Sequence, residues 1–354
     1  MKITWIVNNI NQTGGVEQVV CGLSSYFSKE RGFALKIISV NSVETHTFFP
    51  VDESVSIQHL GSDWRTETFP KLLKLIGNTM KSLDSDILLT CHSTISYAVL
   101  LNRGKFNGKI VVTQHITNNF FTKKRLLCNS VLFRLADRFV VLTESDRQSY
   151  AKFNCPSEVI QNANFKPCHE RAALNSKIIL AAGRMEDAKG FDMLIRAFSE
   201  IADKHPEWKL CICGSGSQEA SIRRQIEDLH ITDRVLLPGM VKNINDYMHN
   251  ASVFALSSRF EGFPLVLIEA MSHGLLVVCF DLPSVHEICS EKAIMIVDQG
   301  DVHGFSKKLD AVVSSASLRQ SLGDTAYELS KRYSVASIAE RWVSLFQELL
   351  MSTI

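Results

Sequence analysis

The length of 354 residues exceeds what one hydrophobic core of ordinary size needs, and it fits two domains of about 150–200 residues each. The hydrophobic fraction of 45%, the charged fraction of 21% and the net charge of +1 are typical of a globular protein and argue against a nucleic-acid-binding protein. No uncharged apolar run reaches about 18 residues, so no transmembrane helix is expected.

The nine cysteines include no C-x-x-C pair, which disfavours a zinc site, and we expect no metal. Cys211 and Cys213 lie in an apolar run typical of a buried strand, where a reduced cysteine serves as a small apolar residue. The opening sequence MKITWIVNN has too short an apolar part for a secretory signal. We therefore expect a cytoplasmic protein.

Strands and helices alternate along the chain, which predicts parallel sheets flanked by helices. In the first half, the predicted strands are KITWIV, LKIISV, DILLTC, KIVVTQ and RFVVLT. After the first strand, apolar residues recur at helical spacing from Val16 to Phe27, and Gly32 stands where a C-terminal cap belongs.

A second series of predicted strands begins after residue 170 and comprises KIILAAG, KLCICG, RVLLPG, SVFALSS, LVVCFD and AIMIV. The stretch between residues 162 and 176 lacks periodicity and contains Pro167, as expected of a linker. The sequence thus predicts an N-terminal domain over residues 1–165 and a C-terminal domain over residues 173–334. We expect the last segment, about 335–354, to form a helix that packs back on the first domain.

Gly14 and Gly15 stand between the first strand and the first helix. A helix N-terminus favours an anion such as diphosphate, but a tight strand-to-helix turn also needs glycine, so both interpretations remain open. The loop does not contain G-x-G-x-x-G, which disfavours a nicotinamide-dependent oxidoreductase.

Arg184 and Lys189 lie in the loop AAGRMEDAKGF, after the first strand of the second domain. Ligands bind at this edge of an open α/β sheet. A guanidinium and an ammonium group together suit a diphosphate and can stabilise it as a leaving group. A pair of solvated surface charges is the alternative.

Two carboxylates frame the segment RFEGFPLVLIEA. Glu261 lies in a Gly/Pro loop, and Glu269 follows eight residues later on a predicted helix, so both can accept hydrogen bonds from the hydroxyls of one sugar or ribose. Alternatively, Glu261 caps the helix and Glu269 is an exposed charge, although the apolar neighbours of Glu269 disfavour this. The intervening residues expected to face the same ligand are Phe263, Pro264, Leu265 and Val266.

Three further residues stand at predicted strand ends. Gly214 and Gly216 follow KLCIC and leave room for a flat base or a close backbone approach. His115 follows KIVVTQ at the carboxyl edge of the first sheet, where a lone histidine is more often structural than functional.

These motifs, in this order, resemble glycosyltransferase family 4, the retaining enzymes of the glycosyl transferases group 1. The resemblance is strongest from about residue 177 to residue 290. It rests on two motifs: G-R…K-G, which runs from Gly183 to Gly190, and E-x7-E, formed by Glu261 and Glu269. It implies an α/β GT-B fold, with two Rossmann-like, doubly wound domains facing each other across a cleft. The first domain would be the acceptor side, and the second would bind the nucleotide sugar.

The resemblance also implies roles for the site residues. Arg184 and Lys189 would bind the donor diphosphate, and Glu269 would bind the ribose. Glu261 would lie beside the donor sugar, and His115 near the reacting carbon. The other expected donor-binding residues are Gly14, Gly15, Gly214, Gly216, Phe263, Pro264, Leu265 and Val266. The family uses neither a metal nor a cofactor.

We therefore predict a retaining hexosyltransferase that moves a sugar, expected from a UDP-sugar, to a glycan or lipid-linked acceptor. Bacterial surface polysaccharide or lipopolysaccharide assembly is the expected pathway. A nucleotide-sugar epimerase of related fold stays open, and so does an inactive GT-B partner subunit. The presence of all four charged site residues argues against the inactive subunit.

The segment 118–135 combines Phe120 and Phe121 with Lys123, Lys124 and Arg125. Aromatic and basic residues on one amphipathic segment are typical of a helix that lies on an anionic membrane surface. The segment predicts docking at the inner face of the cytoplasmic membrane, where a lipid-linked acceptor resides. A helix that packs its apolar face on the sheet is an equal alternative.

Overall fold

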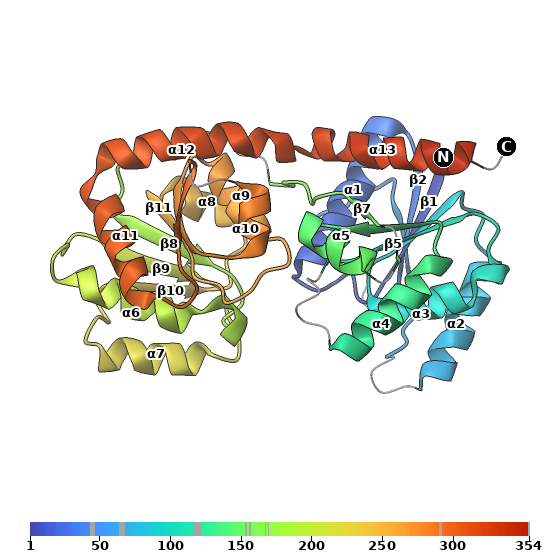
Figure 1. The fold of residues 1–354 in the computed structure, drawn as a ribbon, viewed down its shortest axis with the longest axis horizontal. Helices are drawn as coiled ribbons and strands as arrows, with labels where there is room; N and C mark the ends of the chain where they lie inside the picture. The colour runs from blue at the N-terminus through green and yellow to red at the C-terminus, as the bar shows by residue number, and fades with distance from the viewer. Residues whose placement is uncertain are drawn as a thin grey trace. The chain divides into compact units, whose positions relative to one another are not determined.

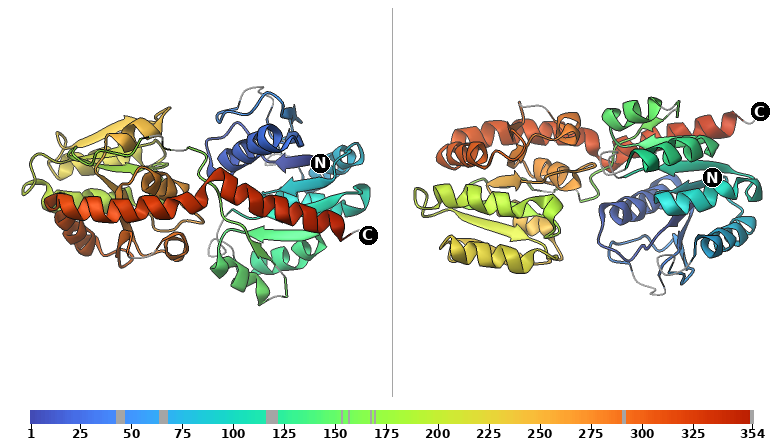
Figure 2. Two further views of the ribbon diagram at one scale, coloured as in Figure 1. Left: turned by 90° about the horizontal axis from the view of Figure 1, so that it is seen from above. Right: turned by 60° about the horizontal axis from the view of Figure 1, so that its bottom comes forward.

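The protein consists of two compact units, residues Met1–Phe165 with Val335–Ile354 and residues Lys166–Ser334 (Figure 1). The computed structural model describes residues 1–42, 47–63, 68–115, 122–152, 154–155, 157–166, 168, 170–289 and 292–352. Each unit contains one parallel sheet with helices on its faces (Figure 2). The predicted class of two parallel α/β domains is therefore confirmed.

The sheet of the first unit has the strand order β3-β2-β1-β4-β5-β6-β7. Its strands are β1 (Lys2–Val7), β2 (Ala34–Ser39), β3 (Ser56–His59), β4 (Ile87–Thr90), β5 (Lys109–Thr113), β6 (Arg138–Val141) and β7 (Glu158–Val159). Its helices include α1 (Gly15–Arg31), α2 (Phe69–Lys81), α3 (Ser93–Leu101), α4 (Lys123–Leu132), α5 (Glu144–Ala151) and the 3-10 turn Phe133–Leu135. The strand order reverses between β1 and β4, so the loops after these strands diverge and leave room for a ligand.

The sheet of the second unit has the order β10-β9-β8-β11-β12-β13 and reverses between β8 and β11. Its strands are β8 (Ile178–Ala182), β9 (Lys209–Cys213), β10 (Val235–Gly239), β11 (Val253–Leu256), β12 (Leu276–Phe280) and β13 (Ile294–Val297). Its helices are α6 (Phe191–Ala202), α7 (Glu219–Asp228), α8 (Ile244–His249), α9 (Leu265–Ser272), α10 (Pro283–Ile288), α11 (Val302–Ser314) and α12 (Ala316–Ser330).

Helices on both faces explain why the central strands are apolar throughout. In the second unit α6 packs against α11 and α9 packs against α12, while α9, α11 and α12 all contact β12. Every residue of β12 is buried, because a strand covered on both sides has no face for polar residues. One core includes Phe198 of α6, Phe280 of β12 and Phe305 of α11, none more than 1% exposed.

The last helix, α13 (Val335–Met351), belongs to the first unit. The ring of Phe346 packs edge-on against Phe27 of α1, with centroids 5.8 Å apart. Ion pairs join Glu340 to Arg31 and Glu348 to Arg138. Among the residues that the structure describes, no helix is both long and apolar enough to cross a membrane.

Phe346→Ala should lower the free energy of unfolding by about 3–5 kcal/mol, because Phe346 is fully buried and its loss leaves a cavity beneath α13. Urea denaturation followed by circular dichroism measures the change. The matched control Gln347→Ala alters the neighbouring exposed side chain and should change this free energy by less than about 0.5 kcal/mol. Equal effects of the two substitutions would contradict the anchoring role of Phe346.

Candidate functional site

The loop after β8 carries both predicted cations of the second unit. Lys189 ends a 3-10 turn, Asp187–Lys189, and Gly190 follows with a left-handed φ of 61° before α6 begins. Arg184 is exposed, and no hydrogen bond or ion pair joins its side chain to any other described residue. Its guanidinium is therefore open to a ligand at the carboxyl edge of the sheet.

The glycines after β9 allow two loops to approach each other closely. A Cβ on Gly214 would lie 1.8 Å from the carbonyl oxygen of Gly183, and φ of Gly214 is 143°. A Cβ on Gly216 would lie 2.5 Å from the carbonyl oxygen of Met185. The N–H of Met185 donates to the carbonyl of Ser215 at 2.8 Å. The glycines thus fix the Arg184 loop against its neighbour by backbone contact.

Glu261 and Lys189 form an ion pair, although they are 72 residues apart in sequence. The Lys189 ammonium donates to Glu261 Oε1 at 2.6 Å, and the Ser258 hydroxyl donates to the same oxygen at 2.6 Å. The side chains of Lys189 and Glu261 are 21% and 12% exposed, so the pair is partly shielded from water and charge-assisted. No described residue donates to Glu261 Oε2, and Pro264, not Glu261, occupies the N-cap of α9.

Glu269 is buried on α9, so it is not an exposed helical charge. Its Oε1 lies 3.3 Å from the ammonium of Lys166, the first residue of the second unit. The side chain of Glu269 is only 5% exposed, and burying a carboxylate without a hydrogen-bonding or charged partner would destabilise the fold. Glu269 and Glu261 therefore have different cationic partners.

The residues between the two carboxylates differ in what they can offer a ligand. The side chain of Phe263 is buried and its ring packs edge-on against Tyr333, with centroids 6.0 Å apart. Leu265 and Val266 begin α9, whose N-terminus has no side-chain cap, so their amide groups are suited to a ligand. Pro264 has no N–H to offer.

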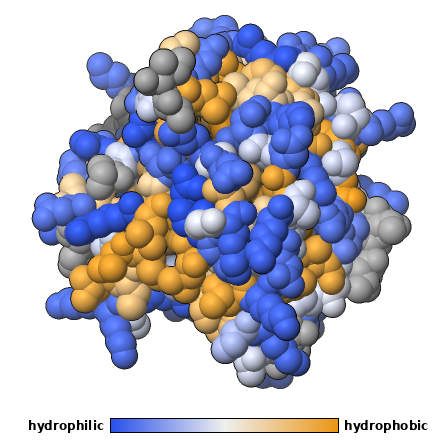
Figure 3. Space-filling model, turned by 90° about the vertical axis from the view of Figure 1, so that its right-hand side faces the viewer, coloured by the Kyte–Doolittle hydropathy of each residue, from blue (hydrophilic) through white to orange (hydrophobic). Residues whose placement is uncertain are grey.

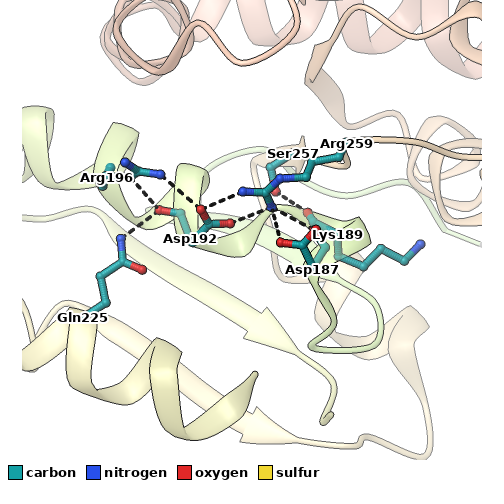
Figure 4. Close-up of polar contacts among 7 residues, drawn as sticks. All are labelled: Asp187, Lys189, Asp192, Arg196, Gln225, Ser257 and Arg259. Atoms are coloured by element: carbon teal, nitrogen blue, oxygen red, sulfur yellow. Dashed lines mark hydrogen bonds and ion pairs between the residues drawn. The ribbon is translucent and has the colours of Figure 1, made fainter. Parts of the chain in front are cut away.

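Sequence reasoning missed two residues that link the charged loops, Arg259 and Asp192 (Figure 4). The guanidinium of Arg259 donates to both carboxylate oxygens of Asp192 at 2.8 and 2.9 Å. The only sequence signals are an arginine two residues before Glu261 and an acidic residue in the first turn of α6. Neither signal shows that the two side chains meet.

The predicted residues of the first unit stand at the carboxyl edge of its sheet. Gly14 is the N-cap of α1, which Gly15 begins. His115 follows β5 and lines a pocket together with His92, Ser93 and Gln114. Because the pocket lies at the ends of β4 and β5, next to the reversal of strand order, its position suits a ligand.

The ring of His115 is held in a low-dielectric setting. Its Nε2 lies 3.0 Å from Thr113 Oγ1. Burial lowers the pKa of His115 from 6.5 to about 4. The imidazole is therefore neutral at pH 7 and can serve as a hydrogen-bonding group, but not as a cation.

The basic segment of the first unit lies on α4. Phe120 and Phe121 are outside the described residues, whereas Lys123, Lys124 and Arg125 form the exposed first turn of this helix. Three apolar side chains at helical spacing are about half exposed on α4 and the turn that follows: Leu127 (50%), Val131 (55%) and Leu135 (49%). Figure 3 shows apolar side chains gathered between hydrophilic ones on this unit.

Comparison with known proteins identifies the family. The family model described as glycosyl transferases group 1 matches residues 166–329. The chain is 30% identical over 253 residues to an N-acetylgalactosamine-N,N'-diacetylbacillosaminyl-diphospho-undecaprenol 4-alpha-N-acetylgalactosaminyltransferase of Campylobacter jejuni, a match that covers 71% of this chain and 67% of that protein. The chain belongs to the glycosyl transferases group 1.

Two relatives match over nearly their whole length. An uncharacterized glycosyltransferase of Haemophilus influenzae is 28% identical, covering 96% of this chain and 98% of its own. The amylovoran biosynthesis glycosyltransferase AmsD of Erwinia amylovora is 25% identical with the same coverage of both chains. The predicted family is therefore confirmed.

Solved structures of low sequence identity share the fold. Sucrose-phosphate synthase from Thermosynechococcus elongatus has a TM-score of 0.84 at 18% identity, covering 99% of this chain and 100% of that one. TarM of S. aureus, solved with fondaparinux, alpha-GlcNAc-glycerol and UDP, has a TM-score of 0.80 at 17% identity, covering 98% and 99%. The predicted GT-B fold class is confirmed.

The stability of the protein should depend on the protonation of His115. Because the folded pKa of about 4 lies below the unfolded value of 6.5, the unfolded state binds the proton first as the pH falls. Stability is therefore lost between about pH 6.5 and pH 4, and His115→Gln should flatten this loss. Melting temperatures measured across this range test it. The control His303→Gln replaces an exposed histidine and should keep the wild-type slope. Parallel curves for all three proteins would contradict the assignment.

Proposed function

We propose that the protein is a retaining glycosyltransferase that takes a sugar from a nucleotide diphosphate-sugar, with UDP as the nucleotide. The observation that carries this is the Lys189–Glu261 pair, with the open guanidinium of Arg184 on the same loop after β8, at the reversal of strand order in the second unit. A ligand bound there would meet two cations for its diphosphate and a carboxylate for a hydroxyl.

The chemistry follows from the donor and acceptor capacity of each group. An ammonium has three N–H donors, and Lys189 uses one on Glu261, so two remain for phosphate oxygens. Arg184 adds a planar fork, and the two cations would neutralise the departing diphosphate without a metal ion. The unoccupied Oε2 of Glu261 would accept a hydroxyl of the donor sugar, and Glu269 would accept the ribose hydroxyls.

Retention would follow a front-face route. The acceptor hydroxyl would attack the anomeric carbon from the side of the leaving diphosphate, an oxygen of which would take the hydroxyl proton. Neutral His115 would act as a hydrogen-bonding group for the donor sugar, because burial keeps it uncharged. Gly14 and Gly15, at the N-terminus of α1, would offer backbone N–H groups to the donor diphosphate.

The relatives support an acceptor that is a growing glycan, either free or on a lipid diphosphate. The Erwinia amylovora protein is named for amylovoran biosynthesis, and the Campylobacter jejuni protein for a diphospho-undecaprenol substrate. S. aureus TarM was solved with UDP. We propose that this chain works in bacterial surface polysaccharide or lipopolysaccharide assembly, on the cytoplasmic side of the membrane.

UDP should raise the melting temperature of the wild-type protein, and Lys189→Ala should abolish most of that shift. A ligand at about 100 times its dissociation constant stabilises the folded state by about 2.7 kcal/mol, which is several degrees. GDP, ADP and NAD serve as comparisons, and Lys204→Ala is a control because Lys204 is an exposed lysine of the same unit that pairs with Asp310. A shift with NAD alone, or none with any diphosphate, would contradict the proposal.

We further propose that α4 lies on an anionic membrane surface. The exposed apolar side chains of α4 and of the turn that follows it would enter the headgroup region, and Lys123 and Lys124 would contact lipid phosphates. The predicted contact through Phe120 and Phe121 is part of the same proposal.

Reversing the charges of Lys123, Lys124 and Arg125 to glutamate should reduce binding to phosphatidylglycerol vesicles at least fivefold, since each basic residue near an anionic surface contributes about 1 kcal/mol. Vesicle co-sedimentation measures this, with phosphatidylcholine vesicles as the reference. Unchanged binding of the variant to phosphatidylglycerol vesicles would contradict the proposal.

A further inference from the structure

The loops after β8 and β11 pack backbone against backbone. The N–H of Arg259 donates to the carbonyl of Ala188 at 2.8 Å. The Ser257 hydroxyl donates to the carbonyl of Lys189 at 2.9 Å (Figure 4). A Cβ on Gly190 would lie 2.2 Å from the carbonyl oxygen of Ser257, so only glycine permits this approach. The conformation of one loop therefore constrains the other.

The side chain of Arg259 makes the most extensive link between the two loops. Its fork is filled by the carboxylate of Asp192, and its Nη1 also donates to the carbonyl of Asp187 at 2.8 Å. Arg259 follows β11, whereas both of its partners lie after β8 (Figure 4). While this bidentate pair is intact, the guanidinium cannot serve as a fork for phosphate.

Asp192 is well placed to hold Arg259. Partial burial raises its pKa, but the hydrogen bonds and charge of Arg259 outweigh this and lower the pKa below the ordinary value. The carboxylate is therefore ionised at neutral pH. Gln225 of α7 donates to the backbone carbonyl of Asp192 at 2.8 Å, which ties this turn of α6 to the neighbouring helix.

The sequence positions of this pair relate it to the candidate donor site. Arg259 stands two residues before Glu261, and Asp192 stands three residues after Lys189. We propose that Arg259 and Asp192 are a positioning pair that holds Lys189 and Glu261 at the spacing donor binding requires. The inference rests on the proposed function, which assigns Lys189 to the donor diphosphate.

The alternative is that the pair serves only the stability of the fold. The side chains of Arg259 and Asp192 are 28% and 38% exposed, and partly exposed ion pairs contribute little to stability. Misplacing a binding group by a small distance can, by contrast, reduce activity strongly. A test must therefore measure ligand binding rather than stability alone.

Arg259→Met should weaken UDP binding about tenfold, as measured by isothermal titration calorimetry, because the Lys189 ammonium loses its fixed position. The matched control is Arg196→Met. Arg196 donates to the same carboxylate at 3.1 Å but lies on α6 itself and links no loops, so this variant should bind UDP within about twofold of wild type. Arg259→Lys, which keeps the charge without the fork, should fall between them.

A second experiment separates positioning from a general structural effect. In a Lys189→Ala background, Arg259→Met should weaken UDP binding by no more than about twofold further, because the group that the pair positions is gone. A general structural role would give the same tenfold factor in both backgrounds and would overturn the inference. If Arg259→Met does not fold, Asp192→Asn tests the same pair with a nearly isosteric change.

Different results would overturn the positioning role of Arg259 and the proposed function. If wild type binds UDP and Lys189→Ala binds it more weakly, but Arg259→Met binds UDP as wild type does, the positioning role is overturned and the proposed function stands. If wild type does not bind UDP, the proposed donor is overturned, and the positioning role falls with it.

Discussion

The parallel pairing of β8 with β11 determines where the charged residues of the second unit lie. Val253 pairs with Ile179 and Phe254 with Leu180, so the two strands end side by side and their loops leave the sheet at one edge. The first loop carries the cations Arg184 and Lys189. The second carries Glu261. A contact between residues 72 positions apart thus follows from strand order and two short loops.

The central strands could be predicted because burial on both faces requires them to be apolar throughout. All six strands expected in the second unit occur, including β10, which tolerates a proline because it is an edge strand. In the first unit, β3 was not among the expected strands. Its sequence, SIQH, is polar and largely accessible at the sheet edge, so it has no apolar run that would reveal it. Gly32 was expected as a helix cap, and its φ of 62° agrees.

The sequence could predict only those features of the candidate site that depend on residues close together in the chain. The apolar neighbours of Glu269 indicated its burial, but not that Lys166 would be its partner. The glycines after β9 stood out, yet the reason only glycine fits at Gly214 is the carbonyl of Gly183 on another loop. The bidentate pair of Arg259 with Asp192 joins residues 67 positions apart, and nothing in either segment alone specifies it.

The two cations would contribute to diphosphate binding in different ways. Lys189 is already held by Glu261, so its ammonium loses little conformational freedom when a ligand arrives and still has N–H groups to donate. Arg184 is exposed, and ordering its long side chain would oppose binding by about 0.5–1.5 kcal/mol. A fixed ammonium is suited to stabilising the negative charge that develops on the diphosphate as its bond to the sugar breaks, because the ammonium does not have to move at that moment. A mobile guanidinium can instead follow the diphosphate as it moves away. Lys189 would therefore act mainly by stabilising the transition state, and Arg184 mainly in the binding and release of the nucleotide.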